Sequence, residues 1–309
     1  MLQILATGGT IAGETDLASG SRRYQAGVRT VERLLDNVPE LTRVASIRAE
    51  QVMALDSKDM HPSDWIRLRG AIRRAEADPA ISGIVVLHGT DTLEETAWYL
   101  HLTTSGRTPL VLTGAMHPAD HPEADGPANL LAAAQLAAAT AAQGKGVLIV
   151  LHGQIHGARM LSKVRTTGLD AFGSSGAWQQ ARPAGQFAHL DTPALPPVAI
   201  LPGYAGAPPE LIESCLATGH RGLVLALTGH GSVPATWLPA LRQARHQGVA
   251  ILRASRCTGP VIRNANADDD GEGWLTAGDL PPPKARIALM LALAAGWSHD
   301  RMALELPTL

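Results

Sequence analysis

The chain has 309 residues, a length that predicts two domains because a typical domain has roughly 150 residues. Lys and Arg number 26 and Asp and Glu number 28, so the net charge of −2 provides no overall positive field and general nucleic-acid binding is disfavoured. With 45% hydrophobic and 17% charged residues, the composition is that of a folded protein with large cores, and disorder is excluded.

Targeting and compartment signals are weak. The opening residues MLQILATGG lack the basic region and the longer apolar stretch of a secretory signal. The longest apolar run, Ile287–Trp297, is shorter than the roughly 20 residues that cross a bilayer. Two cysteines, Cys215 and Cys257, are too few for a disulfide framework and do not have zinc-site spacing. We therefore expect a cytoplasmic protein that is not inserted in a membrane.

The first part of the chain alternates short apolar runs with amphipathic stretches, which predicts βα units around a parallel sheet. The predicted strands are ILAT at 4–7, GIVVL at 83–87, PLVLTG at 109–114 and GVLIVL at 146–151. Two predicted helices each have one apolar stripe at helical spacing: Val28, Val31, Leu34, Leu35 and Val38, then Trp65, Leu68, Ile72 and Ala75. The Leu- and Ala-rich residues 128–142 predict a third helix.

A proline-bearing stretch without periodicity, residues 184–197, has the composition of an interdomain linker. It divides the chain into an N-terminal α/β domain at 1–183 and a smaller C-terminal α/β domain at 198–309. Strands are predicted in the second domain at 198–201, 222–227 and 248–252, and helices near 208–217, 236–247 and 284–296.

Two segments place glycine and hydroxyl residues directly after predicted strands, where ligands of parallel sheets collect. The first is ATGGTIAG at 6–13, in which Gly8 and Gly9 permit a sharp turn that leaves the Thr10 hydroxyl at the sheet edge. An ordinary turn explains this pattern as well. A phosphate cradle is disfavoured because neither glycine-rich nucleotide motif is present.

The second segment is HGTDTLEE at 88–95, where Thr92 before Glu94 and Glu95 predicts a helix N-cap. Capping does not require Thr90 and Asp91, so these two can bind the polar end of a ligand or orient a water. A third segment at 158–167 places Lys163 among hydroxyl residues, where a lysine can activate a neighbouring threonine, although most lysines are merely solvated.

Together these segments resemble the L-asparaginase and glutaminase-asparaginase family of bacterial amidohydrolases. The resemblance runs in order along nearly the whole chain. The motifs that carry it are ILATGGTIAG at 4–13, DSKDM at 56–60, LHGTDTLEETAWYL at 87–100, TGAMHP at 113–118, ADGPANL at 124–130, ARMLSKVRTT at 158–167 and RASRCTGPV at 253–261. The two threonine motifs in series are highly specific.

The resemblance implies a larger N-terminal parallel-sheet domain of flavodoxin-like type, a smaller C-terminal α/β domain, and hydrolysis of L-asparagine to L-aspartate and ammonia without a metal or organic cofactor. It implies Thr10 as the nucleophile, Tyr24 as its hydrogen-bonding partner in the lid at 13–27, and Thr90, Asp91 and Lys163 as the group that activates the nucleophile or the water. Backbone amides near Gly89 and Ala115 are candidates for the oxyanion site.

Further residues are implied for substrate binding. Ser57 matches a position that holds the α-carboxylate of the substrate, Asp91 one that holds the α-ammonium, and Ala115 one that lines the amide end. Lys58 departs from the neutral glutamine of many relatives, and a cation there repels an ammonium but can pair with a carboxylate.

The family also implies a homodimer or homotetramer with sites at subunit contacts. Relatives donate an asparagine and a glutamate from the second domain, but here Ser232 stands near the first position and the stretch at 264–273 has no clear glutamate for the second. We transfer neither role.

Several alternatives stay open. An amidase that prefers glutamine or a D-amino acid, a non-catalytic amino-acid sensor and a transfer-RNA amidotransferase subunit share the resemblance. The pairs His117/His121 and His152/His156 have i, i+4 spacing, yet the first spans a proline-bearing loop, so we expect no metal.

Overall fold

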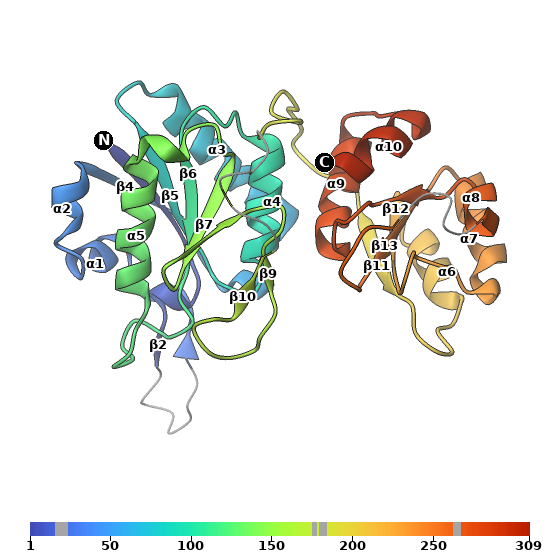
Figure 1. The fold of residues 1–309 in the computed structure, drawn as a ribbon, viewed down its shortest axis with the longest axis horizontal. Helices are drawn as coiled ribbons and strands as arrows, with labels where there is room; N and C mark the ends of the chain where they lie inside the picture. The colour runs from blue at the N-terminus through green and yellow to red at the C-terminus, as the bar shows by residue number, and fades with distance from the viewer. Residues whose placement is uncertain (16–23, 175–177, 179–183, 262–266) are drawn as a thin grey trace. The chain divides into compact units, whose positions relative to one another are not determined.

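The computed structural model describes residues 1–15, 24–174, 178, 184–261 and 267–309. The chain divides into two compact units, Met1–His189 and Leu190–Leu309, which we describe separately. Each unit is an α/β sandwich built on its own parallel sheet (Figure 1). Among the described residues, no helix has the length and apolarity to cross a membrane.

The first unit contains a six-stranded sheet in the order β4-β1-β5-β6-β7-β8, in which only β8 is antiparallel to its neighbour. When the five parallel strands are numbered along the chain, their order is 2-1-3-4-5, the flavodoxin-like arrangement, and the predicted fold class is confirmed. The strands are β1 (Leu2–Gly8), β4 (Ile47–Leu55), β5 (Gly83–Leu87), β6 (Leu110–Thr113), β7 (Val147–Leu151) and β8 (Gln154–Gly157).

Helices cover both faces of this sheet. On one face α1 (Val31–Asp36), α2 (Leu41–Val44) and α5 (Gly126–Ala138) pack together, and on the other lie α3 (Pro62–Ala77) and α4 (Leu93–Thr103) (Figure 1). Residues in β1, β5, β6 and β7 are buried throughout, because a strand covered on both faces needs apolar side chains in both directions.

The helix predictions need two corrections. Val28 is 44% exposed and precedes α1, whose buried positions are Val31 and Leu34. The third predicted helix starts earlier, at Gly126, because Gly126 and Pro127 occupy its first turn, and α5 ends at Ala138 before a separate 3-10 turn at Thr140–Ala142. The apolar stripe of α3 is confirmed, since all four of its predicted side chains are buried.

Short elements extend from the sheet of the first unit. They are the antiparallel pair β2 (Glu14–Thr15) and β3 (Tyr24–Gln25), and the antiparallel pair β9 (Ser162–Lys163) and β10 (Phe172–Gly173). Both pairs lie at the lower edge of this unit in Figure 1. The 3-10 turns Thr10–Ala12 and Ser57–Asp59 follow β1 and β4.

The second unit contains a four-stranded parallel sheet in sequential order: β11 (Val198–Pro202), β12 (Gly222–Leu227), β13 (Ala250–Ser255) and β14 (Leu275–Thr276). Its helices are α6 (Glu210–Ala217), α7 (Leu238–His246), α8 (Ala267–Gly271), α9 (Pro282–Ala294) and α10 (His299–Glu305). The buried Trp237 and Leu241 join α7 to the core formed with Leu223 and Leu225 of β12. This smaller α/β unit was predicted.

Candidate active site

The loops after β1 and β5 meet at two glycines. A Cβ atom added to Gly9 would lie 2.2 Å from Gly89 Cα, and one added to Gly89 would lie 2.6 Å from Ser57 Oγ. In the 2-1-3-4-5 order, β1 and β5 flank the point at which the chain changes direction across the sheet, where parallel α/β sheets bind ligands. The two threonine motifs therefore meet at this edge of the sheet, where their backbones are in contact.

Thr10 begins the 3-10 turn after β1 and is half-buried. The preceding backbone is held on both sides: Gly9 N–H donates to Leu55 O at 2.8 Å, and Gly9 O accepts from Gly27 N–H at 3.2 Å. Gly9 has φ 79°, a left-handed conformation that glycine adopts without strain. The position of Thr10 thus follows from main-chain contacts with β4 and with the segment after β3.

Lys163 joins the two polar residues of the second motif. Its ammonium Nζ lies 3.0 Å from Thr90 Oγ1 and 2.6 Å from Asp91 Oδ1. Thr90 is buried, the side chain of Lys163 is 20% exposed, and that of Asp91 is 51% exposed. The group is therefore a hydroxyl inside the protein with an amine and a half-exposed carboxylate beside it. Lys163 N–H also donates to Glu94 Oε2 at 2.9 Å, which fixes β9 against the start of α4.

Ser57 connects the loop after β4 to the second motif. Its hydroxyl accepts a hydrogen bond from Asp91 N–H at 3.2 Å, and its carbonyl accepts one from the Thr92 hydroxyl at 2.8 Å. Thr92 is the N-cap residue of α4, with Glu94 and Glu95 in the first turn as predicted, but the Thr92 side chain makes no capping hydrogen bond to that helix. The hydroxyl bonds to a neighbouring loop instead.

The charge of Lys58 is balanced by its own loop. Its ammonium lies 2.7 Å from Asp56 Oδ2 and 3.0 Å from Asp59 Oδ2, and these two carboxylates hold the pKa of Lys58 well above its usual value. Lys58 is exposed beside the buried Ser57. Its cation is therefore paired within the loop that carries Ser57.

The loop after β6 is fixed by two residues whose roles the sequence did not reveal. Asp125 accepts hydrogen bonds from Met116 N–H at 3.1 Å and His117 N–H at 2.9 Å. The buried Asn129 donates to Gly114 O at 3.0 Å and accepts from His152 N–H at 2.9 Å. These bonds set the position of Gly114 and of the fully buried Ala115. Both residues belong to the ADGPANL motif at 124–130, and this motif is the sequence feature from which their roles could have been inferred.

His88 is the first residue of the second threonine motif, and its side chain bonds to the backbone of that motif. Its ring is fully buried, with Nδ1 2.7 Å from Gly89 O and Nε2 3.4 Å from Met60 Sδ. Burial lowers the pKa of His88 to about 4, because an imidazolium ion would lose its hydration there. A neutral ring that bonds a carbonyl must donate from Nδ1, so His88 orients the Gly89 peptide without adding charge.

Some residues that the sequence predicted for the active site are not brought to it by the described part of the structure. The side chain of Tyr24 and much of the predicted lid at 13–27 lie outside the described residues. Ser232 belongs to the second unit, and residues 264–266 of the stretch at 264–273, where relatives carry a glutamate, also lie outside the described residues.

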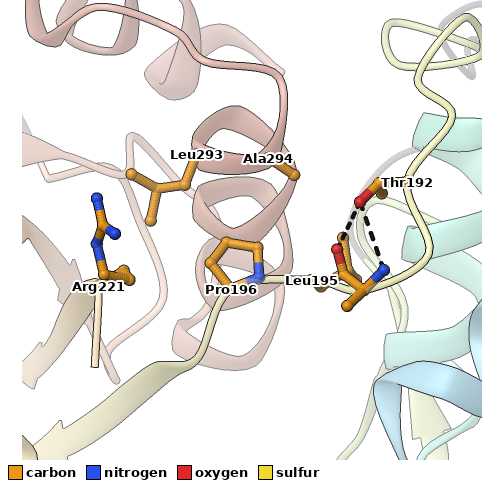
Figure 2. A pocket seen from close by; sticks show the side chains of 7 residues that line it. Thr192, Leu195, Pro196, Arg221, Leu293 and Ala294 are labelled. Carbon is orange, nitrogen blue, oxygen red and sulfur yellow. Dashed lines mark hydrogen bonds between the residues drawn. The ribbon is translucent and has the colours of Figure 1, made fainter. Parts of the chain in front are cut away.

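The second unit has a separate hollow of about 340 Å³ next to β11 and α9 (Figure 2). Its lining includes one charged side chain, Arg221, and one hydroxyl, Thr192, which bonds back to Ala194 O at 2.6 Å. The lining residues contain no carboxylate and no amine, so this hollow does not have the groups that proton transfer requires.

The arrangement in the first unit defines a class of protein. A parallel α/β unit places a threonine loop, a second buried threonine, a lysine and a carboxylate at the switch point of its sheet. These are the kinds of group that a nucleophilic hydrolase uses: hydroxyls, and an amine within hydrogen-bond distance of one of them.

Comparison with known proteins identifies the family. The family model described as "Asparaginase, N-terminal" matches residues 1–193, and "Glutaminase/Asparaginase C-terminal domain" matches residues 197–303. The chain belongs to the asparaginase family of amidohydrolases, in which the sequence motifs had placed it.

Individual relatives match over most of their length. The chain is 38% identical to a probable periplasmic L-asparaginase of Haemophilus influenzae, covering 94% of this chain and 88% of the relative. It is 37% identical to a glutaminase-asparaginase of Pseudomonas fluorescens, covering 94% and 85%. Among solved structures, a probable cytoplasmic L-asparaginase from Campylobacter jejuni aligns with a TM-score of 0.89 at 33% identity, covering 98% of this chain and 97% of that one.

Proposed function

We propose that this chain hydrolyses the side-chain amide of L-asparagine to L-aspartate and ammonia through an acyl ester on Thr10. The observation that carries the proposal is the joint placement of two hydroxyl loops, since the Gly9 and Gly89 backbones touch and Lys163 lies 3.0 Å from the Thr90 hydroxyl. Membership of the asparaginase family supports the substrate class.

In the first half-reaction, Thr10 Oγ attacks the side-chain amide carbon and its proton passes to a base. A threonine hydroxyl is a poor nucleophile at neutral pH, so this proton transfer is needed. The amide oxygen gains negative charge, which backbone N–H groups near Gly89 and Ala115 stabilise. The C–N bond then breaks, the nitrogen takes up a proton and leaves as ammonia, and an aspartyl ester remains on Thr10.

In the second half-reaction, a water attacks the ester carbon and restores Thr10. Thr90 and Lys163 are suited to take the proton from this water, because the amine contacts the buried hydroxyl directly. Asp91 balances the charge of the protonated lysine at 2.6 Å and, with half of its side chain exposed, binds the α-ammonium of the substrate. Ser57 binds the α-carboxylate, and Tyr24 orients Thr10 from the lid.

The substrate preference is a second part of the proposal. The named relatives include both L-asparaginases and glutaminase-asparaginases, so glutamine is the leading alternative substrate. Lys58 does not present a free cation to either ligand, because Asp56 and Asp59 pair with it. We therefore assign Lys58 an indirect part in binding, through the shape of the loop that carries Ser57.

The test measures ammonia release from L-asparagine, L-glutamine and D-asparagine by the wild type and by Thr10→Ala. We expect asparagine to be the preferred substrate and Thr10→Ala to be at least about a thousandfold slower, as is found when a covalent nucleophile is lost. The exposed Thr218→Ala in the second unit serves as the control and should keep full activity. Near-normal turnover by Thr10→Ala refutes the nucleophile, and binding of aspartate without any ammonia release indicates a sensor.

We further propose a homodimer or homotetramer in the cytoplasm. One named relative is periplasmic and one solved relative is cytoplasmic, so fractionation of cells expressing the native gene decides the compartment. Light scattering coupled to gel filtration gives the number of subunits, and a monomer with full activity would exclude a site completed by a neighbour.

A further inference from the structure

The loop between β6 and α5 carries a cluster of metal-binding side chains that the proposed reaction does not use. Ligand atoms of His117, His121 and Glu123 all lie within 4.8 Å of one another. The sequence argued against a metal here because prolines break the helical register. The structure shows that no helix is needed, since a loop turn brings both imidazole rings to a centroid distance of 4.4 Å.

Two prolines and two backbone hydrogen bonds fix the conformation of this loop's backbone. Pro118 and Pro122 follow the two histidines and restrict the backbone on each side. His121 N–H donates to Pro118 O at 3.0 Å, and Ala124 N–H donates to His121 O at 3.0 Å. The backbone of the loop that carries the three side chains is therefore held before any ion arrives.

His117 has the hydrogen bond that metal-bound histidines usually have. Its Nδ1 lies 2.9 Å from Glu123 O, and because a carbonyl can only accept, this nitrogen carries the proton. The lone pair of His117 is then on Nε2, which is available as a ligand. An outer hydrogen bond of this kind fixes the tautomer and the orientation of a metal-ligating ring.

His121 and Glu123 complete the set. His121 Nδ1 accepts from Glu123 N–H at 3.0 Å. An ion binds this exposed ring either at Nδ1, in place of that N–H, or at Nε2 with the ring proton on Nδ1, and in both cases the Glu123 N–H is left to water. The Glu123 carboxylate is exposed on the same turn. Ligands of a tetrahedral zinc ion lie about 3.3 Å apart, so the most separated atoms of this cluster approach by at most about 1.5 Å.

Neighbouring carboxylates have other partners. Asp120 accepts from Thr15 N–H at 2.9 Å and from the Thr15 hydroxyl at 3.2 Å. Asp125 binds backbone amides of the loop, as described above. Glu123 is thus the carboxylate left for an ion.

From these observations we infer that His117, His121 and Glu123 form a binding site for a divalent transition-metal ion, best fitted by Zn²⁺, with water at the fourth position. Two imidazoles and one carboxylate favour zinc over magnesium or calcium, which prefer oxygen ligands. The site lies at the base of the predicted lid, because Ala119 N–H donates to Gly13 O at 3.0 Å and Asp120 holds Thr15.

The test titrates Zn²⁺ into the untagged full-length protein by isothermal titration calorimetry. His121→Asn is the main variant, because its amide oxygen can still accept from Glu123 N–H and preserve the loop; Glu123→Gln is the second. We expect one tight Zn²⁺ site per chain and an affinity at least about tenfold weaker in either variant, given that loss of even an outer partner costs 10- to 100-fold. The exposed His246→Asn of α7 is the matched control and should bind as the wild type does.

A second measurement is the visible spectrum of the Co²⁺-loaded protein. A four-coordinate site gives intense bands in the wild type that are absent from His121→Asn, while circular dichroism shows that both proteins are folded. Equal Zn²⁺ affinity in the wild type and both variants would overturn the inference, and so would a wild type that binds no ion. Because neither measurement uses turnover, the result is independent of the proposed asparagine hydrolysis.

Discussion

Substitution of Gly9 by alanine probes the contact that brings the two threonine loops together. The added Cβ would lie 2.2 Å from Gly89 Cα and 2.4 Å from Gly89 N, both backbone atoms that no rotamer change can move. Overlap of this kind typically costs 1–3 kcal/mol, and an alanine at φ 79° adds about 1 kcal/mol. We therefore expect Gly9→Ala to lower the free energy of unfolding by about 2–4 kcal/mol.

Gly144→Ala is the matched control. Gly144 has φ 68° and an added Cβ would have no atom within 4 Å, so this variant has the backbone strain without the overlap and should lose only about 1 kcal/mol. Urea unfolding followed by circular dichroism gives both values, and ammonia release gives activity. A shift of about 1 Å between the loops should also slow Gly9→Ala by about a hundredfold. If the two variants are equally stable and equally active, close packing is not the reason for glycine at position 9.

Substitutions at three more residues probe the surroundings of this contact. Lys163→Met should lower kcat by about 10²–10⁴-fold, and Lys163→Arg, which keeps the charge but cannot accept a proton, should lower it similarly; an active arginine variant would show that only the charge matters. Because the pKa of His88 falls from 6.5 to about 4 on folding, the unfolded chain takes up the proton first as the pH drops. His88 therefore stabilises the fold fully above about pH 6.5, and this contribution of up to about 3 kcal/mol disappears toward pH 4. Unfolding free energies at several pH values should show a steeper acid loss in the wild type than in His88→Gln, and equal slopes would contradict burial of a neutral ring. Asn129→Ala leaves the buried carbonyl of Gly114 without its side-chain partner and the amide of the exposed His152 to water, and should destabilise by about 1–3 kcal/mol in the same unfolding assay; an unchanged midpoint would mean that water replaces both bonds.

The sequence predicted the central strands well because their residues are apolar on both faces. β5 occupies 83–87 as expected, and β12 occupies 222–227. Edge strand β4 was not recognised, since polar residues interrupt it and Val52 and Met53 are its only buried positions. A strand with one covered side lacks the continuous apolar run on which that prediction depended.

The candidate site was only partly predictable for a related reason. Thr10 and Thr90 could be located because each follows a strongly apolar strand by a few residues. The place of Lys163 depends on contacts across 69 to 73 positions, with Glu94 and Thr90, which no local pattern encodes. The buried ring of His88 was overlooked because a histidine beside glycine has no distinctive spacing.

The contacts that join the loops after β1, β4 and β5 are formed largely by main-chain atoms or by Ser57. The positions of these loops around the candidate site therefore depend little on the other side chains that face it. Side chains that face the candidate site can therefore be exchanged while the main-chain frame keeps its dimensions. A main-chain frame of this kind can accommodate substrates whose side chains differ by one methylene, as those of asparagine and glutamine do. Proteins named L-asparaginase and glutaminase-asparaginase both occur among the relatives of this chain.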